Sequence, residues 1–261
     1  MSDREKILRY YRSSGEEQVA AKLLDAAEGV QRSRKYKVTE FLDPYGYTIA
    51  ETVAAHYDQV ELQANGGYLG AERQKVAFVH PEFRGIPDFM LSALKFSWDS
   101  RYYHLAHRDV LGAVLGLGIK RETIGDIIMM GDSAQIIVDT AIASFIEKNI
   151  TQIGAAAVSV VPERLEQIAP REEKVKEIKT TVASLRLDVI AAAGFGVSRS
   201  KMADEIAADK VKVNWQQAKS SSQAMKQGDI ISMRGRGRVE ICEILGQTKK
   251  GRTSIFLKRF I

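Results

Sequence analysis

Long hydrophobic runs and cysteine pairs are both absent from this chain of 261 residues. No apolar run approaches the ~20 residues that a membrane-spanning helix needs, so we expect no membrane partner. A single cysteine, Cys242, excludes an internal disulfide and is typical of a reducing compartment. Residues 1–17, MSDREKILRYYRSSGEE, are charged and lack the apolar core of a secretory signal. We therefore expect a cytoplasmic location.

Signatures of catalysis and of metal binding are also scarce. His104 and His107 have the i, i+3 spacing of a metal pair, but no cysteine or carboxylate cluster accompanies them. The HRD sequence at 107–109 imitates a kinase catalytic loop, yet Val114 stands where that loop has its asparagine. The stretch GAVLGLG at 112–118 is too apolar for a cofactor-binding turn and runs along an expected helix. We expect a protein that is not an enzyme and needs no cofactor.

Positive charge is concentrated in the last third of the chain. Residues 182–261 contain 15 Lys and Arg against 7 Asp and Glu, whereas the remainder has 23 basic and 26 acidic residues. A basic module on a slightly acidic body is the electrostatic footprint of a nucleic-acid-binding protein. A solvated basic face that keeps the protein soluble is the alternative.

The order of helix and strand patterns predicts an α+β protein with three domains. Residues 1–82 are expected to form a helical domain with a hairpin, because Asp43-Pro44 starts a helix and Asn65-Gly66-Gly67 separates two alternating segments. Residues 83–162 show a β-α-β-α-β order, which predicts an α/β sandwich with helices on one face of a sheet. The charged range 163–181 is expected to be a linker with some helical character.

Residues 182–261 are expected to form two short helices followed by a small antiparallel sheet. Ser198 is the expected N-cap of the second helix, and Arg199 and Lys201 crowd its first turn. Cations there meet the positive end of the helix dipole, which costs up to about 1 kcal/mol. We interpret the missing anion as RNA phosphate, while the alternative is that both side chains extend into solvent. Arg186, on the first helix, is expected to point outward.

Several motifs of this module resemble the S-four RNA-binding domain over roughly residues 182–245. They are Arg186-Leu187-Asp188, Ser198-Arg199-Ser200-Lys201, Val211-Lys212-Val213-Asn214, and Gly228-Asp229 leading into Met233-Arg234-Gly235. In that family the second helix and the strands after it form one RNA-facing surface. The resemblance and the local charge together give these candidate RNA-binding residues: Arg186, Ser198, Arg199, Ser200, Lys201, Lys210, Lys212, Asn214, Arg234, Arg236 and Arg238.

Two details qualify this candidate surface. Arg234, Arg236 and Arg238 alternate, so on a strand all three side chains would lie on one face. Lys210 departs from the family pattern, in which a glycine often precedes the first strand, and Arg236 stands in place of an aromatic residue. Few aromatic residues accompany these cations, which favours recognition of a folded RNA by shape and phosphate position.

Nearly the whole chain resembles the YlmH-type proteins. The resemblance is carried by NGGYLGAERQKVAF (65–78), LAHRDVLGAVLGLGIKRETIGDI (105–127) and SLRLDVIAAAGFGVSRSK (184–201). It implies an N-terminal helical domain, a central domain similar to an RNA-recognition (RRM) fold, and the S-four domain. It also implies binding to ribosomal RNA and tRNA on the large ribosomal subunit, in ribosome-associated quality control of stalled peptidyl-tRNA.

Two alternatives of other classes remain open from the sequence. One is an RNA-modifying enzyme with an active site in residues 83–162. The other is a scaffold linked to cell division, with a protein partner bound through the N-terminal half.

Overall fold

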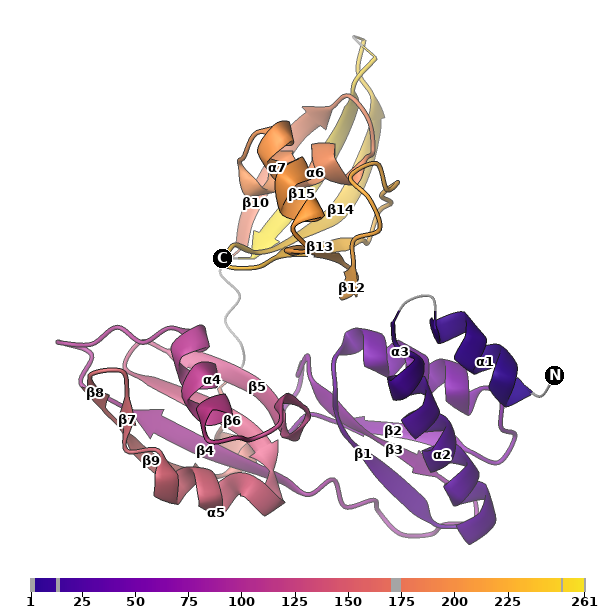
Figure 1. Cartoon of the computed structure of the whole chain (residues 1–261), viewed down its shortest axis with the longest axis vertical. Helices are drawn as coiled ribbons and strands as arrows, with labels where there is room; N and C mark the ends of the chain where they lie inside the picture. Colours follow the sequence, from indigo (N-terminus) through magenta and orange to yellow (C-terminus); the bar gives the residue numbers. More distant parts are fainter. Residues whose placement is uncertain (1–2, 13–14, 170–174, 250, 261) are drawn as a thin grey trace. The chain divides into compact units, whose positions relative to one another are not determined.

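The computed structural model describes residues 3–12, 15–169, 175–249 and 251–260. It divides into two compact units, Met1–Arg171 and Glu172–Ile261 (Figure 1). The first unit contains α1 (Asp3–Arg12), α2 (Glu17–Ser33), β1 (Tyr36–Leu42), α3 (Pro44–Ala54), β2 (Glu61–Asn65), β3 (Gln74–Val79), β4 (Leu91–Ser97), α4 (His107–Gly116), β5 (Ile124–Met130), β6 (Ser133–Asp139), α5 (Thr140–Asn149), β7 (Gln152–Ile153), β8 (Ala156–Ala157) and β9 (Ser159–Glu163). The second contains β10 (Val175–Val182), α6 (Leu187–Phe195), α7 (Arg199–Ala207), β11 (Val211–Val213), β12 (Gln216–Gln217), β13 (Ile230–Met233), β14 (Gly237–Gln247) and β15 (Thr253–Phe260). No helix of these described ranges is long and apolar enough to cross a membrane.

The N-terminal part packs three helices against a three-stranded antiparallel sheet of order β1-β3-β2. Leu24 of α2, Ile49 of α3 and Phe78 of β3 are fully buried in its core. The predicted start of α3 is confirmed, because the Asp43 side chain accepts a hydrogen bond from Gly46 N at 2.9 Å. The predicted hairpin is confirmed as β2 and β3, although β1 was not expected.

The central part has the element order β4-α4-β5-β6-α5-β9, with α4 and α5 on one face of a sheet of order β5-β6-β4-β9 (Figure 1). This is the β-α-β-β-α-β arrangement of ferredoxin-like and RNA-recognition folds. The expected order β-α-β-α-β was therefore wrong by one strand. Gly125 and Asp126 interrupt the apolar pattern of β5, which hid this strand between α4 and β6.

The opposite face of the central sheet is covered by other segments of the same unit. Phe41 of β1 and Ile168, which follows β9, pack with Ile128 and Ile137 of the sheet in one buried cluster. Gln135 reinforces this cover, because its buried amide donates to Gln167 O at 3.0 Å and accepts from Ala169 N at 2.8 Å. The N-terminal part and the central part thus share a hydrophobic core.

A carboxylate of the central sheet also ties the two parts together. Asp126 accepts hydrogen bonds from Tyr68 Oη at 2.8 Å, from Glu72 N at 2.7 Å and from Arg73 N at 3.1 Å. The Arg73 guanidinium reaches back to the carbonyls of Ile124 and Phe41, each at 3.0 Å. We call this group of Tyr68, Arg73 and Asp126 the Asp126 node.

A second polar tie joins β3 to the start of α5. The Lys75 side chain is only 3% exposed and forms an ion pair with Asp139. Asp139 also caps α5, since its other oxygen accepts from Ala141 N at 2.9 Å. A buried cation with a hydrogen-bonded counter-ion holds its two segments in a defined register because its charge has no access to water.

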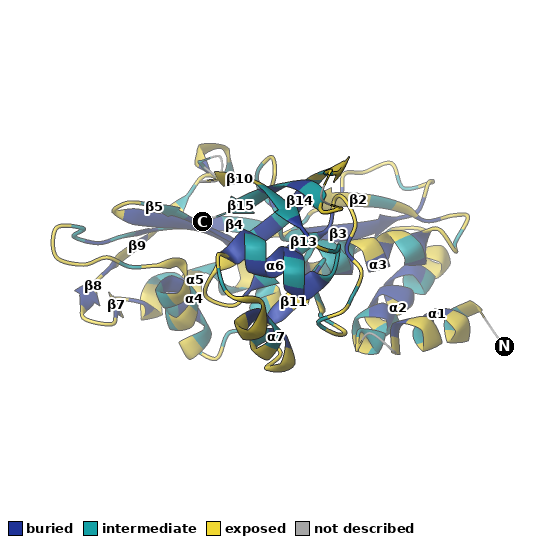
Figure 2. Ribbon diagram, turned by 90° about the horizontal axis from the view of Figure 1, so that it is seen from above, coloured by how far each residue is buried: buried dark blue, intermediate teal, exposed yellow. Residues whose placement is uncertain are grey.

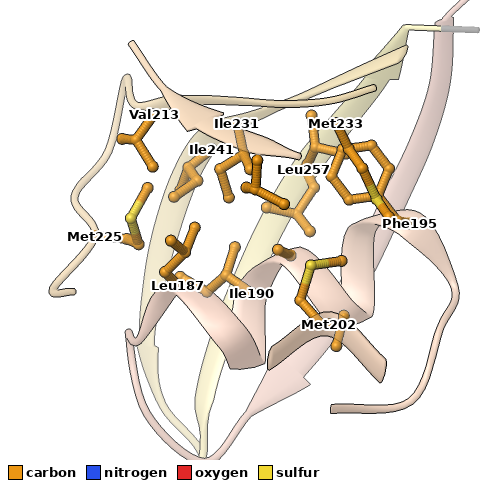
Figure 3. Packing of buried hydrophobic residues seen from close by; sticks show 14 of the residues in the cluster. Leu187, Ile190, Phe195, Met202, Val213, Met225, Ile231, Met233, Ile241 and Leu257 are labelled. Atoms are coloured by element: carbon orange, nitrogen blue, oxygen red, sulfur yellow. The ribbon is translucent and has the colours of Figure 1, made fainter. Parts of the chain in front are cut away.

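The second unit folds as a six-stranded antiparallel sheet of order β10-β15-β14-β13-β11-β12, with α6 and α7 on one face. Leu187 and Ile190 of α6 and Met202 of α7 point toward Ile241 and Leu257 of the sheet (Figure 3). Gly196 ends α6 with a φ of 66°, a left-handed conformation that favours glycine. The predicted α+β class and the two short helices of this module are confirmed.

The expected linker at 163–181 is wrong on both sides of residues 170–174. Glu163 ends β9, and Leu165 and Ile168 pack in the cluster on the central sheet. Val175–Val182 forms β10, which pairs with β15 along its full length, from Val175 opposite Phe260 to Val182 opposite Thr253. The alternating charges that suggested a linker lie on an edge strand, where polar side chains are common. Residues 170–174 lie outside the described part of the chain.

Candidate RNA-binding surface

The N-terminus of α7 is built as the sequence predicts. Ser198 is the N-cap, and its Oγ accepts a hydrogen bond from Lys201 N at 3.2 Å. Ser200 and Lys201 are exposed, as is much of α7 in Figure 2, whereas α6 is mostly buried. The side chain of Met202, the residue after Lys201, is buried in the core. Ser200 and Lys201 therefore face solvent.

The Arg199 guanidinium pairs with a carboxylate of the protein itself, that of Asp188. The interpretation that its missing anion is RNA phosphate is therefore wrong for Arg199. Its Nε donates to Asp188 Oδ2 at 2.8 Å, and Arg186 Nε donates to Asp188 Oδ1 at 3.0 Å. Arg186 therefore does not point freely outward as expected. The Asp188 side chain is only 5% exposed, so two arginines surround a nearly buried carboxylate. Sequence spacing did not reveal this because Asp188 and Arg199 lie on different helices.

The two arginines decide the ionisation of Asp188. Burial alone raises the pKa of this carboxyl, but hydrogen bonds and charges from Arg186 and Arg199 outweigh burial, and the pKa is lowered from its ordinary value. A group with a lowered folded pKa stabilises the fold above its unfolded pKa of about 3.9, and this contribution is lost as the pH falls through the folded value.

Replacing Asp188 with asparagine is accordingly expected to destabilise the Glu172–Ile261 unit by about 1 to 3 kcal/mol at neutral pH. The difference from wild type should shrink steadily as the pH falls below about 4. Urea unfolding followed by hydrogen exchange of peptides from this unit measures both values. Asp204→Asn, at an exposed position of α7, is the matched control. A penalty that stays constant with pH would contradict a role for the charge.

Three other cations gather around one carboxylate beside α7. Lys210 Nζ lies 2.8 Å from Glu205 Oε2. The hydrogen bond from Lys210 is the main cause of the lowered pKa of Glu205, and the charges of Lys201 and Arg236 lower it further. Lys201 lies one helical turn before Glu205 on α7, and the turn that carries Arg234 and Arg236 is bonded to Lys210, because Arg234 N donates to Lys210 O at 3.0 Å. We call Lys201, Lys210, Arg234 and Arg236 the basic cluster.

Arg234 and Arg236 occupy a turn, so the prediction that they share one strand face with Arg238 is wrong. β13 ends at Met233 and β14 begins at Gly237, so Arg234 and Arg236 lie in the connection between them. The turn is held to the end of α7, because Arg234 N donates to Lys210 O at 3.0 Å. Gly237 has a φ of 84°, and an added Cβ would meet Phe260 O at 2.3 Å. Both arginines are therefore presented to solvent by a turn that only glycine permits at this position.

Two predicted residues lie on the sheet face that is opposite α6 and α7. Lys212 pairs with Ser232, which in turn pairs with Arg238, so the three share one row across β11, β13 and β14. The Arg238 guanidinium lies 5.4 Å from the centre of the Phe260 ring. Lys212 and Arg238 thus lie on the face away from α7, the helix that carries Lys201.

Asn214 has a structural role inside the module. It adopts a φ of 48°, donates to Asp229 Oδ1 at 2.9 Å and accepts from Ile230 N at 2.8 Å. The amide joins the end of β11 to the start of β13. Its assignment as an RNA contact was based on the resemblance alone and stays a prediction.

Glu205 is the organising residue that the sequence analysis missed. Its spacing of five residues from Lys210, across the end of α7, was the available signal. Among the described residues, no group of three or more His, Cys, Asp or Glu side chains could hold a metal ion.

Comparison with protein families matches three successive segments of the chain. Residues 15–83 match the family "YlmH, N-terminal", residues 86–167 match "Putative RNA-binding domain in YlmH", and residues 185–231 match "S4 domain". These families support an RNA-binding role.

Two proteins with known names are similar to this chain. The chain is 35% identical over 232 residues to "Ribosome-associated protein quality control protein P2" of Bacillus subtilis (strain 168), covering 88% of this chain and 90% of that protein. It also resembles the solved structure of "Cell division protein ylmH from Streptococcus pneumoniae", with a TM-score of 0.51 and 23% identity over 59% of this chain and 95% of that one. The similarity to the solved structure shows that the two proteins have a similar fold. With three family matches in the expected order and a relative aligned over most of its length, the chain belongs to the YlmH family.

Proposed function

We propose that this protein binds ribosomal RNA and tRNA on the large ribosomal subunit, and that it acts in ribosome-associated quality control without catalysing a reaction. The relative from Bacillus subtilis carries that process in its name. The observation that supports the proposal is the basic cluster of exposed cations: Lys201 lies one turn before Glu205 on α7, Lys210 pairs with Glu205, and the turn with Arg234 and Arg236 is bonded to Lys210. A protein with this function works in the cytoplasm.

The physical basis of binding is the release of counterions from phosphates. Lys201 and Arg236 are exposed, and Glu205 is already engaged by Lys210. Cations that are held near one another repel, and RNA phosphates relieve this repulsion while they release condensed counterions to the solvent. The N-terminus of α7 adds the positive end of the helix dipole, which also attracts phosphate.

The domain assignment that goes with this function is 1–82, 83–162 and an RNA-binding module at 182–261, which we extend back to Val175 because β10 belongs to its sheet. The family matches at 15–83, 86–167 and 185–231 support these divisions. The module at the C-terminal end carries the proposed ribosome contact.

Co-sedimentation with purified large subunits tests the proposal. We expect the full chain to pellet with subunits, more tightly when they carry peptidyl-tRNA, and to be released as salt rises. Absence of binding at low salt would contradict the proposal. Nucleoside analysis of ribosomal RNA and tRNA from a deletion strain tests the alternative of an RNA-modifying enzyme. Loss of a single modification there would show a catalytic role.

A further inference from the structure

The central domain has the RNA-recognition arrangement, but its sheet lacks the features with which that fold binds RNA. Such domains stack bases on aromatic side chains of the two middle strands. On the corresponding face of β4 and β6, this chain has Ala93, Lys95, Gln135 and Ile137. Ala93 and Ile137 are buried beneath the cluster that contains Phe41. RNA bound by this domain must therefore use a different surface.

A groove lies beside α4, on the side of the central domain that carries its helices. It has a volume of about 840 Å³, within the range of about 300 to 1,000 Å³ that is typical of ligand sites. Its walls come from the loop after β4 (102–105), from α4, and from the segment 149–156 that contains β7 and β8. The sheet face and this groove belong to separate surfaces because α4 packs on the sheet through Val110 and Val114.

The floor of the groove is lined by glycine. Gly112 and Gly116 lie on α4, and an added Cβ at either position would meet no other heavy atom within 4 Å. Gly112 lies within α4 and Gly116 is its last residue, and neither is required by packing or by a positive φ. The missing side chains leave the backbone of α4 open to close approach by a ligand at these two positions.

The rim of the groove combines exposed aromatic rings with a cation. Tyr102 and Tyr103 are neighbours in sequence and are 72% and 36% exposed, and the Arg101 guanidinium lies 5.6 Å from the centre of the Tyr102 ring. The Arg108 side chain is 88% exposed and lies 3.6 Å from Asp109, whose carboxylate also accepts from Ala106 N at 2.8 Å. Asp109 is thus occupied at the start of α4, and Arg108 is presented to the solvent.

We propose that this groove binds single-stranded RNA, with bases stacked on Tyr102 and Tyr103 and a phosphate held by Arg108. Base stacking on aromatic rings beside arginine is the usual chemistry of single-strand binding. The half-buried Leu105 and Leu117 also line the groove, but Ile150 and Ile153 are 4% exposed and belong to the domain core. The most exposed side chains at the rim are aromatic and cationic, which favours RNA over a peptide. The inference rests on the proposed RNA-binding function and adds a second contact of a different kind to the basic cluster.

Fluorescence anisotropy with a labelled 12-nucleotide oligouridine and the full chain tests this inference. Tyr102→Ala is expected to weaken binding about 10-fold, because one stacking surface is lost. Tyr102→Phe, which keeps the ring, should remain within about 2-fold of wild type. Tyr10→Ala, at a tyrosine that is 71% exposed on α1, is the matched control and should also remain near wild type.

A second readout separates the groove from the other surfaces. Crosslinking of a 4-thiouridine-substituted oligomer should label peptides from 101–116 or 149–156. Lys95→Ala, on the sheet face, should leave the affinity unchanged. Wild-type affinity of Tyr102→Ala, or crosslinks confined to residues 175–260, would overturn the inference and leave the groove for a protein partner. The co-sedimentation test reports on ribosome binding whichever result is obtained here, so failure of this inference can be distinguished from failure of the proposed function.

Discussion

Replacing Asp126 with alanine is expected to lower the free energy of unfolding of the Met1–Arg171 unit by about 3 to 5 kcal/mol. Asp126 is 8% exposed and accepts three hydrogen bonds, from Tyr68 and from the backbone of Glu72 and Arg73. Without the carboxylate, these donors lose their acceptor in a site with little access to water. A buried donor without a partner costs about 1 to 3 kcal/mol.

The charge of Asp126 also offsets that of nearby arginines. The pKa of Arg121 is lowered to about 10, mainly by burial and then by the charge of Arg73, and the charge of Asp126 opposes both effects. In Asp126→Ala, two half-buried guanidiniums would remain close to one another without this carboxylate. The loss should therefore exceed the value of the hydrogen bonds alone.

Hydrogen exchange measured by mass spectrometry in urea resolves the two units and checks this expectation. Peptides from 15–169 should lose protection at lower urea in Asp126→Ala, whereas peptides from 175–260 should behave as in wild type. Asp58→Ala, at an exposed position of the same unit, is the control and should change stability by less than about 0.5 kcal/mol. A similarly small change for Asp126→Ala would show that the Asp126 node does not hold the two parts together.

The second large effect concerns binding to the ribosome. The variant Lys201→Ala/Arg236→Ala should lose most of its binding to large subunits at physiological salt. If each side chain contacts one phosphate, the slope of log affinity against log salt should become shallower by about 2. Co-sedimentation at a series of salt concentrations measures both quantities.

The choice of these two residues follows from the structure of the module. Arg199 is a poorer probe, because its ion pair with Asp188 means that Arg199→Ala changes folding as well as any RNA contact. Lys176→Ala/Lys258→Ala removes the same charge from β10 and β15 and serves as the matched control. An unchanged slope in Lys201→Ala/Arg236→Ala, or an equal loss in the control, would count against the basic cluster as the contact surface.

Local signals in the sequence were sufficient for the helices. Asp43 with Pro44 and Ser198 with its first turn both marked the start of a helix, because a capping side chain acts within three residues. The two helices expected within residues 83–162 are α4 and α5. These elements were predictable because the interactions that start them lie close in sequence.

The strands that were missed depend on distant partners. β10 has the sequence VKEIKTTV, in which charges alternate with apolar and small residues, and it is a strand because β15 offers a free edge about 75 residues later. β1 has only one fully buried side chain, Phe41, and its apolar contacts are with the central sheet. Neither relationship is visible in a short window of sequence.

The sequence was sufficient to predict which residues belong to the candidate surface, but not which of them bind to other residues of the protein. The module and the exposed cations at Lys201 and Arg236 were predicted. The sequence could not show that Asp188 takes up Arg186 and Arg199, or that Asn214 bonds within the module, because both depend on how two separate segments pack. The charge that crowds the start of α7 is thus partly neutralised within the protein.

The pairing of β10 with β15 sets where this module can be cut from the rest of the chain. A fragment that starts at residue 182, as the S-four resemblance suggests, would lack the outermost strand and expose one side of β15 along all 8 of its residues. Unpaired amides and carbonyls on a bare sheet edge recruit strands from other molecules, and the result is aggregation or strand exchange. An expression fragment that begins before Val175 keeps that edge covered and yields the module in its soluble form.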